Sequence, residues 1–116
     1  MFRRSTFNEA QATLDALSRS QAIIEFSMGG AILGANKNFL DVVGYDLVSI
    51  LGKEHRIFVD EREATDPSYA ELWSKLRAGQ YISGEFLRKA RSGANVWLQA
   101  SYNPVFGADG KPFKVV

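Results

Sequence analysis

Hydrophobic and polar side chains alternate along residues 95–106, which read NVWLQASYNPVF. Successive side chains of a β-strand point to opposite faces of a sheet, so this alternation predicts a strand with one buried face and one outward face. The more apolar parity is expected to line a core or a pocket, and it includes Leu98, Ala100 and Tyr102. Trp97 lies on the opposite, polar parity, so its large ring needs a cover.

Apolar residues near the N-terminus recur at spacings of three, four and three, which is typical of an amphipathic helix or a short coiled-coil seam. They are Phe7, Ala10, Leu14 and Leu17. Residues 66–79, DPSYAELWSKLRAG, predict the clearest helix, which Asp66 or Ser68 can cap and Gly79 can end. Residues 37–52 predict two short helices between these elements.

Glycine-rich turns separate the remaining apolar stretches. AIIEFSM and AILGAN flank Gly29 and Gly30 and predict a β-hairpin, while residues 81–116 predict three strands joined by the turns RSG and ADGKP. We therefore expect an α+β domain, with a five-stranded antiparallel sheet and helices laid over one face. Residues 1–21 would form an N-terminal amphipathic helix, and residues 22–116 would form the domain itself.

Composition narrows the classes of partner. The 116 residues suit one domain, and a formal charge of +1 provides no field that would select nucleic acid. The chain contains no cysteine, its apolar runs are short, and its N-terminus lacks a hydrophobic signal core, so we expect a cytoplasmic protein. The final KPFKVV has the pattern of a strand that has just begun, so we expect a segment of a longer protein, truncated in its last strand.

Several motifs together resemble a PAS domain. They are GAILGANKNFLDVVGY, ILGKEHRIFV, YAELWSKLRAGQYISGEF and SGANVWLQASYNPVFGADGKPFKVV, which span residues 22–116 approximately. The combination is similar to the PAS domains of bacterial methyl-accepting chemotaxis proteins of the biofilm-dispersion and aerotaxis transducer types. This resemblance implies a PAS fold, a homodimer and a downstream methyl-accepting signalling domain.

The resemblance also implies which face of the sheet holds a pocket. In PAS domains the helices and the concave face enclose the pocket, so Leu98, Ala100 and Tyr102 would point into it. The convex face is typically covered by the N-terminal helix or a partner. We therefore expect the apolar stripe of that helix, from its own chain or from a second one, to cover Trp97. The alternative is that Trp97 only completes a small hydrophobic cluster.

His55 is the only histidine, and it lies between Glu54 and Arg56 among the helices that line a PAS pocket. Some PAS sensors bind haem, so the resemblance makes His55 a candidate axial ligand. A lone histidine between two charged residues is more commonly a surface or capping residue. No set of three residues is suited to zinc.

Trp73 is a second candidate for cofactor contact. Aerotaxis transducers carry a tryptophan in a similar stretch of a FAD-binding PAS domain, so Trp73 could stack on a flavin ring. The alternative is a core tryptophan, because the helical stripe predicts burial by itself. Asn36 precedes a predicted helix and is expected to cap it.

Two functions therefore remain open. The first is a sensory module that couples a small molecule, haem or flavin to a signalling domain, and the second is a cofactor-free dimerisation or interaction domain. An enzyme is not expected, because the chain has no glycine-rich phosphate loop and no supported catalytic set.

Overall fold

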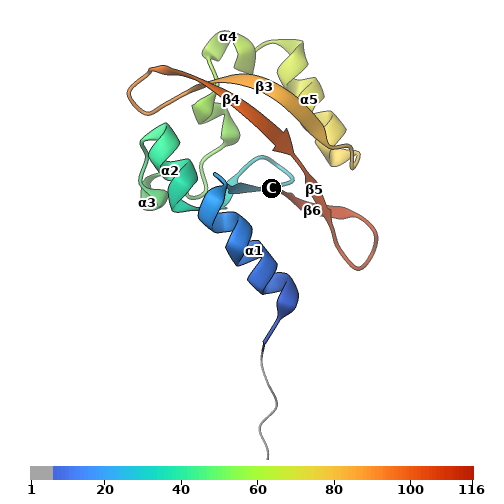
Figure 1. The fold of residues 1–116 in the computed structure, drawn as a ribbon. Coiled ribbons are helices and arrows are strands. Elements are labelled where there is room, and N and C mark those ends of the chain that lie inside the picture. The colour runs from blue at the N-terminus through green and yellow to red at the C-terminus, as the bar shows by residue number, and fades with distance from the viewer. Residues whose placement is uncertain (1–6) are drawn as a thin grey trace, which may run out of the picture.

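The computed structural model describes residues 7–116, so residues 1–6 of the predicted N-terminal unit lie outside the described residues. Helix α1 (Glu9–Ser20) leads into a hairpin of β1 (Ile24–Ser27) and β2 (Ile32–Ala35) (Figure 1). Five short helical segments follow: α2 (Lys37–Val43), α3 (Leu47–Ile50), η1 (His55–Phe58), α4 (Glu61–Ala64) and α5 (Pro67–Arg77). The chain ends with β3 (Ile82–Lys89), β4 (Asn95–Tyr102), β5 (Pro104–Phe106) and β6 (Pro112–Val115).

Helix ends follow the predicted capping chemistry. The Asn36 side chain accepts from the Phe39 amide at the start of α2, and Asp66 accepts from the Ser68 amide at the start of α5. Gly44 ends α2 in the left-handed conformation with φ 75°, which a residue with a Cβ adopts only under strain. The caps predicted at Asn36 and Asp66 are thus confirmed.

The α+β class is confirmed, but the strand count differs from the expected five. The strands β2, β1, β6 and β5 form one antiparallel sheet in that order, and β3 and β4 form a separate antiparallel pair. The expected middle strand of the last three is divided at Asn103 into β4 and β5. Pro104 of β5 pairs with Val115 of β6, and Asn103 exchanges backbone hydrogen bonds with Val116, whereas within residues 7–116 β4 pairs only with β3.

The alternation predicted for β4 is confirmed. Tyr102 is buried and Leu98 and Ala100 are half-buried, whereas Gln99 and Ser101 are exposed. The inward parity of β4 pairs with the inward parity of β3, where Leu98 lies opposite Phe86. These residues pack toward a core formed by the hairpin, the helices and the strand ends, which consists of Phe26, Ile32, Phe39, Val43, Ile50, Phe58, Trp73, Leu76, Tyr102 and Val115.

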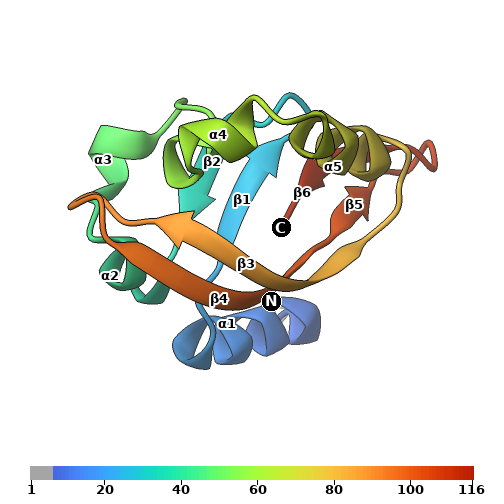
Figure 2. The same cartoon turned by 90° about the horizontal axis from the view of Figure 1, so that it is seen from above.

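Helix α1 lies apart from this core. It lies on the opposite side of the strands from α5 (Figure 2) and contains no buried residue. Leu14 and Leu17 are 57% and 49% exposed, Phe7 and Ala10 are also exposed, and Trp97 is 69% exposed. The expectation that α1 covers Trp97 within one chain is therefore wrong, because the helix lies over the other end of β4. The arrangement with a second chain stays a prediction.

The two tryptophans provide a matched test of this packing. Trp73 is 6% exposed and meets Phe26 edge to face, with ring centroids 5.8 Å apart. Trp73→Ala should lower the free energy of unfolding by about 3–5 kcal/mol, because it leaves a large cavity in the core. Trp97→Ala should change it by less than about 0.5 kcal/mol. Urea denaturation of both variants measures this difference, and equal losses would contradict the assignment of Trp73 to the core.

Candidate functional site

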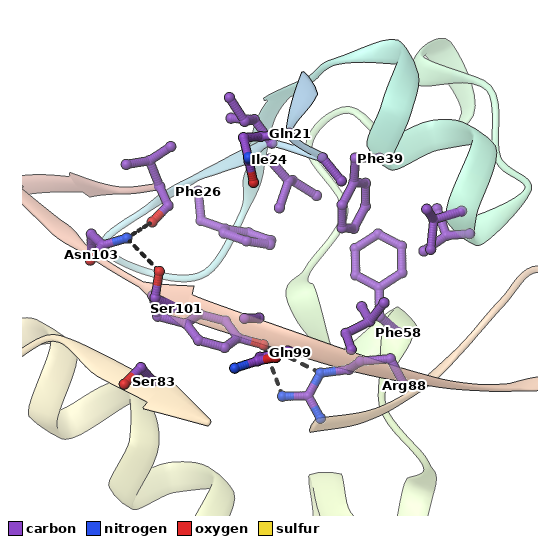
Figure 3. Close-up of a pocket in the computed structure, with 18 of the residues that line it drawn as sticks. Gln21, Ile24, Phe26, Phe39, Phe58, Ser83, Arg88, Gln99, Ser101 and Asn103 are labelled. Carbon is purple, nitrogen blue, oxygen red and sulfur yellow. Dashed lines mark hydrogen bonds between the residues drawn. The ribbon is translucent and has the colours of Figure 1, made fainter. Parts of the chain in front are cut away.

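A cavity of about 780 Å³ lies between the hairpin and β4. Phe26, Phe39 and Phe58 form its apolar wall, and β4 forms the wall opposite them (Figure 3). Leu14 and Leu17 of α1 contribute to its lining. Four of the predicted pocket residues also line it, namely His55, Leu98, Ala100 and Tyr102, whereas Trp73 does not.

His55 lies at the inner wall of this cavity and is only 3% exposed. Its Nδ1 lies 2.7 Å from the Tyr69 hydroxyl, and its Nε2 lies 3.0 Å from the Tyr102 hydroxyl. The expectation of a surface or capping histidine is therefore wrong. The imidazole can be buried because both of its ring nitrogens have hydrogen-bond partners.

The neighbouring arginine determines which nitrogen of His55 carries the hydrogen. Arg88 donates to the Tyr102 hydroxyl oxygen from Nε at 3.3 Å and from Nη2 at 2.8 Å. A guanidinium can only donate, so the Tyr102 oxygen accepts these bonds and its own hydrogen is directed to Nε2 of His55. The neutral imidazole therefore carries its hydrogen on Nδ1 and donates it to Tyr69.

Arg88 is 4% exposed, and its positive charge has a specific partner. Its Nη1 donates to Oε2 of Glu63 at 3.0 Å and to the Leu87 carbonyl oxygen at 2.9 Å. A buried guanidinium is tolerated only when a counter-charge and hydrogen bonds replace its water. We call the connected set Glu63, Arg88, Tyr102, His55 and Tyr69 the polar network.

Burial governs the protonation of the polar network. Burial, and then the charge of Arg88, lower the pKa of His55 from 6.5 to about 3, so the imidazole is neutral near pH 7. Burial also raises the pKa of Tyr102 and of Tyr69 above the usual value near 10, so both hydroxyls keep their hydrogens.

The arrangement does not fit a haem ligated by His55. An axial ligand needs an open ring nitrogen, and both nitrogens of His55 are already engaged by tyrosine hydroxyls. Among residues 7–116, no group of three histidine, cysteine, aspartate or glutamate side chains lies close enough together to hold a metal ion.

The position of Trp73 favours the core alternative over flavin stacking. Its ring packs edge to face against Phe26 and His55, and its six-membered ring lies close beneath Gly30. The aromatic residues that do line the cavity are Phe26, Phe39, Phe58 and Tyr102. A planar ligand in this cavity would therefore meet phenylalanine rings and the polar network.

Arg88 is one of the site residues that sequence reasoning missed. The sequence did contain an indication of its role, because Arg88 shares the inward parity of β3 with Ile82 and Phe86. A charged residue on the apolar parity of a strand indicates a buried ion pair or a functional site. Its partner Glu63 is 25 residues away, so no local pattern could identify it.

Comparisons with known proteins agree with this architecture. A family model described as PAS fold matches residues 32–116. Biofilm dispersion protein BdlA of Pseudomonas aeruginosa is 50% identical over 109 residues, which cover 94% of this chain and 26% of that protein. The aerotaxis receptor of Escherichia coli is 28% identical over 74 residues, which cover 64% of this chain and 14% of the receptor. The chain therefore spans about a quarter of the length of the biofilm dispersion protein and a smaller share of the aerotaxis receptor.

Solved structures share the fold. A light-oxygen-voltage domain studied with a flavin analogue superposes with a TM-score of 0.74 and 22% identity, covering 90% of this chain and 79% of that one. Among residues 7–116, no helix is long and apolar enough to span a membrane.

Burial of neutral His55 predicts a pH dependence of stability. Its pKa is about 3 in the folded chain, against the ordinary value of 6.5 that applies to the unfolded chain, so between these values only the unfolded chain binds the proton. Stability due to this group is therefore complete above the unfolded pKa and falls with decreasing pH, by about 1.4 kcal/mol per unit. From about pH 7 to about pH 5, the wild type should lose about 2 kcal/mol more than His55→Gln.

Urea denaturation of both proteins at several pH values measures this difference. The comparison cancels contributions that are common to both proteins. Parallel pH profiles for wild type and His55→Gln would contradict burial of a neutral imidazole.

Proposed function

Because the chain belongs to the PAS fold family, we propose that it is the sensory module of a chemotaxis-type signal transducer. Occupancy of its cavity by a small molecule would control a downstream methyl-accepting signalling domain. The 50% identity to a biofilm dispersion protein over nearly the whole chain supports this proposal. The similarity to an aerotaxis receptor points in the same direction.

The observation that carries the proposal is the polar network at the cavity wall. Arg88 and Tyr102 line the cavity, while their partners Glu63 and Tyr69 lie on α4 and α5. A ligand that displaces the Tyr102 hydroxyl leaves buried donors of Arg88 and a buried acceptor of His55 without partners. The network must then rearrange, and the helices that carry its other members move with it. The polar network would then have two alternative arrangements, and a bound ligand would shift the equilibrium between them.

Our first candidate for the ligand is a flavin. The phenylalanine wall suits a planar heteroaromatic ring, and Arg88 and Gln99 provide polar partners for its edge. A flavin analogue in a structural neighbour supports this choice. The second candidate is a cofactor-free interaction domain, which the burial of Trp73 and the exposure of Trp97 favour.

Flavin binding can be tested with a variant that fills the cavity. Half-buried Ala100 lines it, so Ala100→Trp should weaken binding of FAD or FMN at least about tenfold, which corresponds to about 1.4 kcal/mol. Val48→Trp is the control, because Val48 is 87% exposed and does not line the cavity. The absorption spectrum of the purified protein and flavin fluorescence titrations provide the readout. A colourless protein that binds neither flavin would contradict this choice and favour the cofactor-free alternative.

We also propose that the chain forms a homodimer through α1 and the outward face of β4. Leu14, Leu17 and Trp97 are large apolar side chains that are about half exposed or more. An isolated helix as short as α1 is marginal in water and needs packing on its apolar stripe. A two-fold arrangement would cover the stripe of one chain and Trp97 of the other together.

Sedimentation tests this interface. The intact chain should be a dimer at high micromolar concentration, while Leu14→Glu and a chain beginning at Gln21 should be monomers, because a charge or a deletion removes the stripe. Val48→Glu places the same charge at an exposed position of α3 and should leave the dimer intact. A monomeric intact chain would contradict the interface, and so would a dimer that survives both changes.

A further inference from the structure

A second, smaller hollow lies on the other side of the polar network. It is a groove of about 300 Å³ between α5 and β3, and we call it the outer groove. Three members of the polar network line it, namely Glu63, Tyr69 and Arg88. Of these three, Arg88 also lines the cavity. The polar network therefore has one side toward the cavity and another toward the outer groove.

Arg88 has one N–H group without an acceptor. A guanidinium carries five N–H groups in a planar fork. Nε and Nη2 each donate to the Tyr102 hydroxyl oxygen, and Nη1 donates to Glu63 and to the Leu87 carbonyl oxygen. The second hydrogen of Nη2 has no acceptor among residues 7–116, and it lies at the tip of the fork, next to the Nη1 group that Glu63 engages. Arg88 is 4% exposed, so this donor needs an acceptor in the outer groove.

Tyr69 and Glu63 add two more open groups. The Tyr69 oxygen accepts from Nδ1 of His55, so the Tyr69 hydroxyl hydrogen is available, and in the described part of the chain it has no acceptor. Glu63 accepts from Arg88 with Oε2, while its Oε1 bonds to no group within residues 7–116. The outer groove thus combines two open donors with one open carboxylate oxygen.

The rest of the lining is apolar or balanced in charge. Half-buried Leu72, Ile82 and Phe86 form the apolar part. The charged residues that line the outer groove are two of each sign, Glu63, Glu71, Lys75 and Arg88. A ligand with a net charge would therefore meet a like charge as well as an opposite one. A ligand that carries both charges can pair each of them.

We propose that the outer groove binds a small zwitterion with an apolar side chain, namely an apolar α-amino acid. Its carboxylate accepts from Nη2 of Arg88 and from the Tyr69 hydroxyl, and its ammonium donates to Oε1 of Glu63. The two charges of an α-amino acid are attached to one carbon atom. This spacing suits Arg88 and Glu63, which are themselves in contact, with Nη1 3.0 Å from Oε2. The side chain packs on Leu72 and Phe86.

This site goes beyond the sensory proposal, because it lies outside the cavity. Arg88 belongs to both hollows, so ligands of the cavity and of the outer groove change each other's affinity by the same factor.

L-Leucine is the probe, and it is titrated into residues 1–116 without flavin. Two analogues each lack one charge: 4-methylpentanoate has no ammonium, and 3-methylbutylamine has no carboxylate. Calorimetry should give L-leucine an affinity at least about tenfold higher than that of either analogue, because each analogue leaves one charge of the outer groove unpaired. In NMR spectra, L-leucine should shift the amide signals of Tyr69, Leu72 and Phe86.

Two variants locate the bound probe. Ser68→Trp should fill the outer groove and weaken L-leucine binding at least about tenfold. Ser74→Trp is the matched control, because Ser74 is another exposed serine of α5 and does not line the groove. Glu63→Gln gives the outer groove a net positive charge, so it should weaken L-leucine binding and strengthen binding of 4-methylpentanoate.

Three results would overturn the proposal. The first is no binding of L-leucine at millimolar concentration, and the second is equal affinity for all three probes. The third is L-leucine binding that survives Ser68→Trp but is lost in Ala100→Trp, because the probe would then lie in the cavity. No flavin is present in these titrations, so failure here leaves the sensory proposal to its own binding test.

Discussion

The polar network is the constraint on which the rest of the structure depends. A neutral imidazole can be buried only if both nitrogens are satisfied, and His55 takes one partner from α5 and one from β4. Its position in η1 then follows from those two hydroxyls. Arg88 adds β3 and, through Glu63, α4. Three consecutive helical segments (η1, α4 and α5) and two consecutive strands (β3 and β4) are therefore held together by one connected set of hydrogen bonds, surrounded by aromatic rings.

Such a network is stable only when it is complete. In a poorly solvated interior, each bond strengthens its neighbours, and each orphaned group costs the full desolvation penalty. Removing one member therefore affects all of the others, which favours two discrete arrangements over gradual deformation. Tyr102 occupies the central place, because it accepts from Arg88 and donates to His55 while it also lines the cavity. A ligand that contacts Tyr102 thus acts on every element of the network.

Local chemistry made much of the fold predictable, and distant partners made the rest unpredictable. Alternation predicted the faces of β4, and caps such as Asp66 predicted helix ends, because both depend on neighbours in sequence. The burial of His55 depends on tyrosines that are 14 and 47 residues away in the sequence. The neighbouring charges of Glu54 and Arg56 therefore led to the wrong prediction of a surface or capping residue. The number of strands depends on which strand edges pair with each other, and no single stretch of the sequence determines that pairing. Among these distant partners, only Arg88 could have been recognised from the sequence, because it is a charged residue on the apolar parity of a strand.

The structure also contains a continuous route from the cavity to α1. Asn36 and Asn38 donate from their side chains to carbonyl oxygens of Ser18 and Gln21, and so satisfy the orphan acceptors where α1 ends. Asn36 also caps α2, whose Phe39 lines the cavity and meets Phe58 edge to face at 5.4 Å. The direction of α1 is therefore determined by polar contacts at its C-terminal end, while its apolar stripe remains accessible. Phe39 is therefore linked through the Asn36 side chain to the end of the helix that we propose for the dimer.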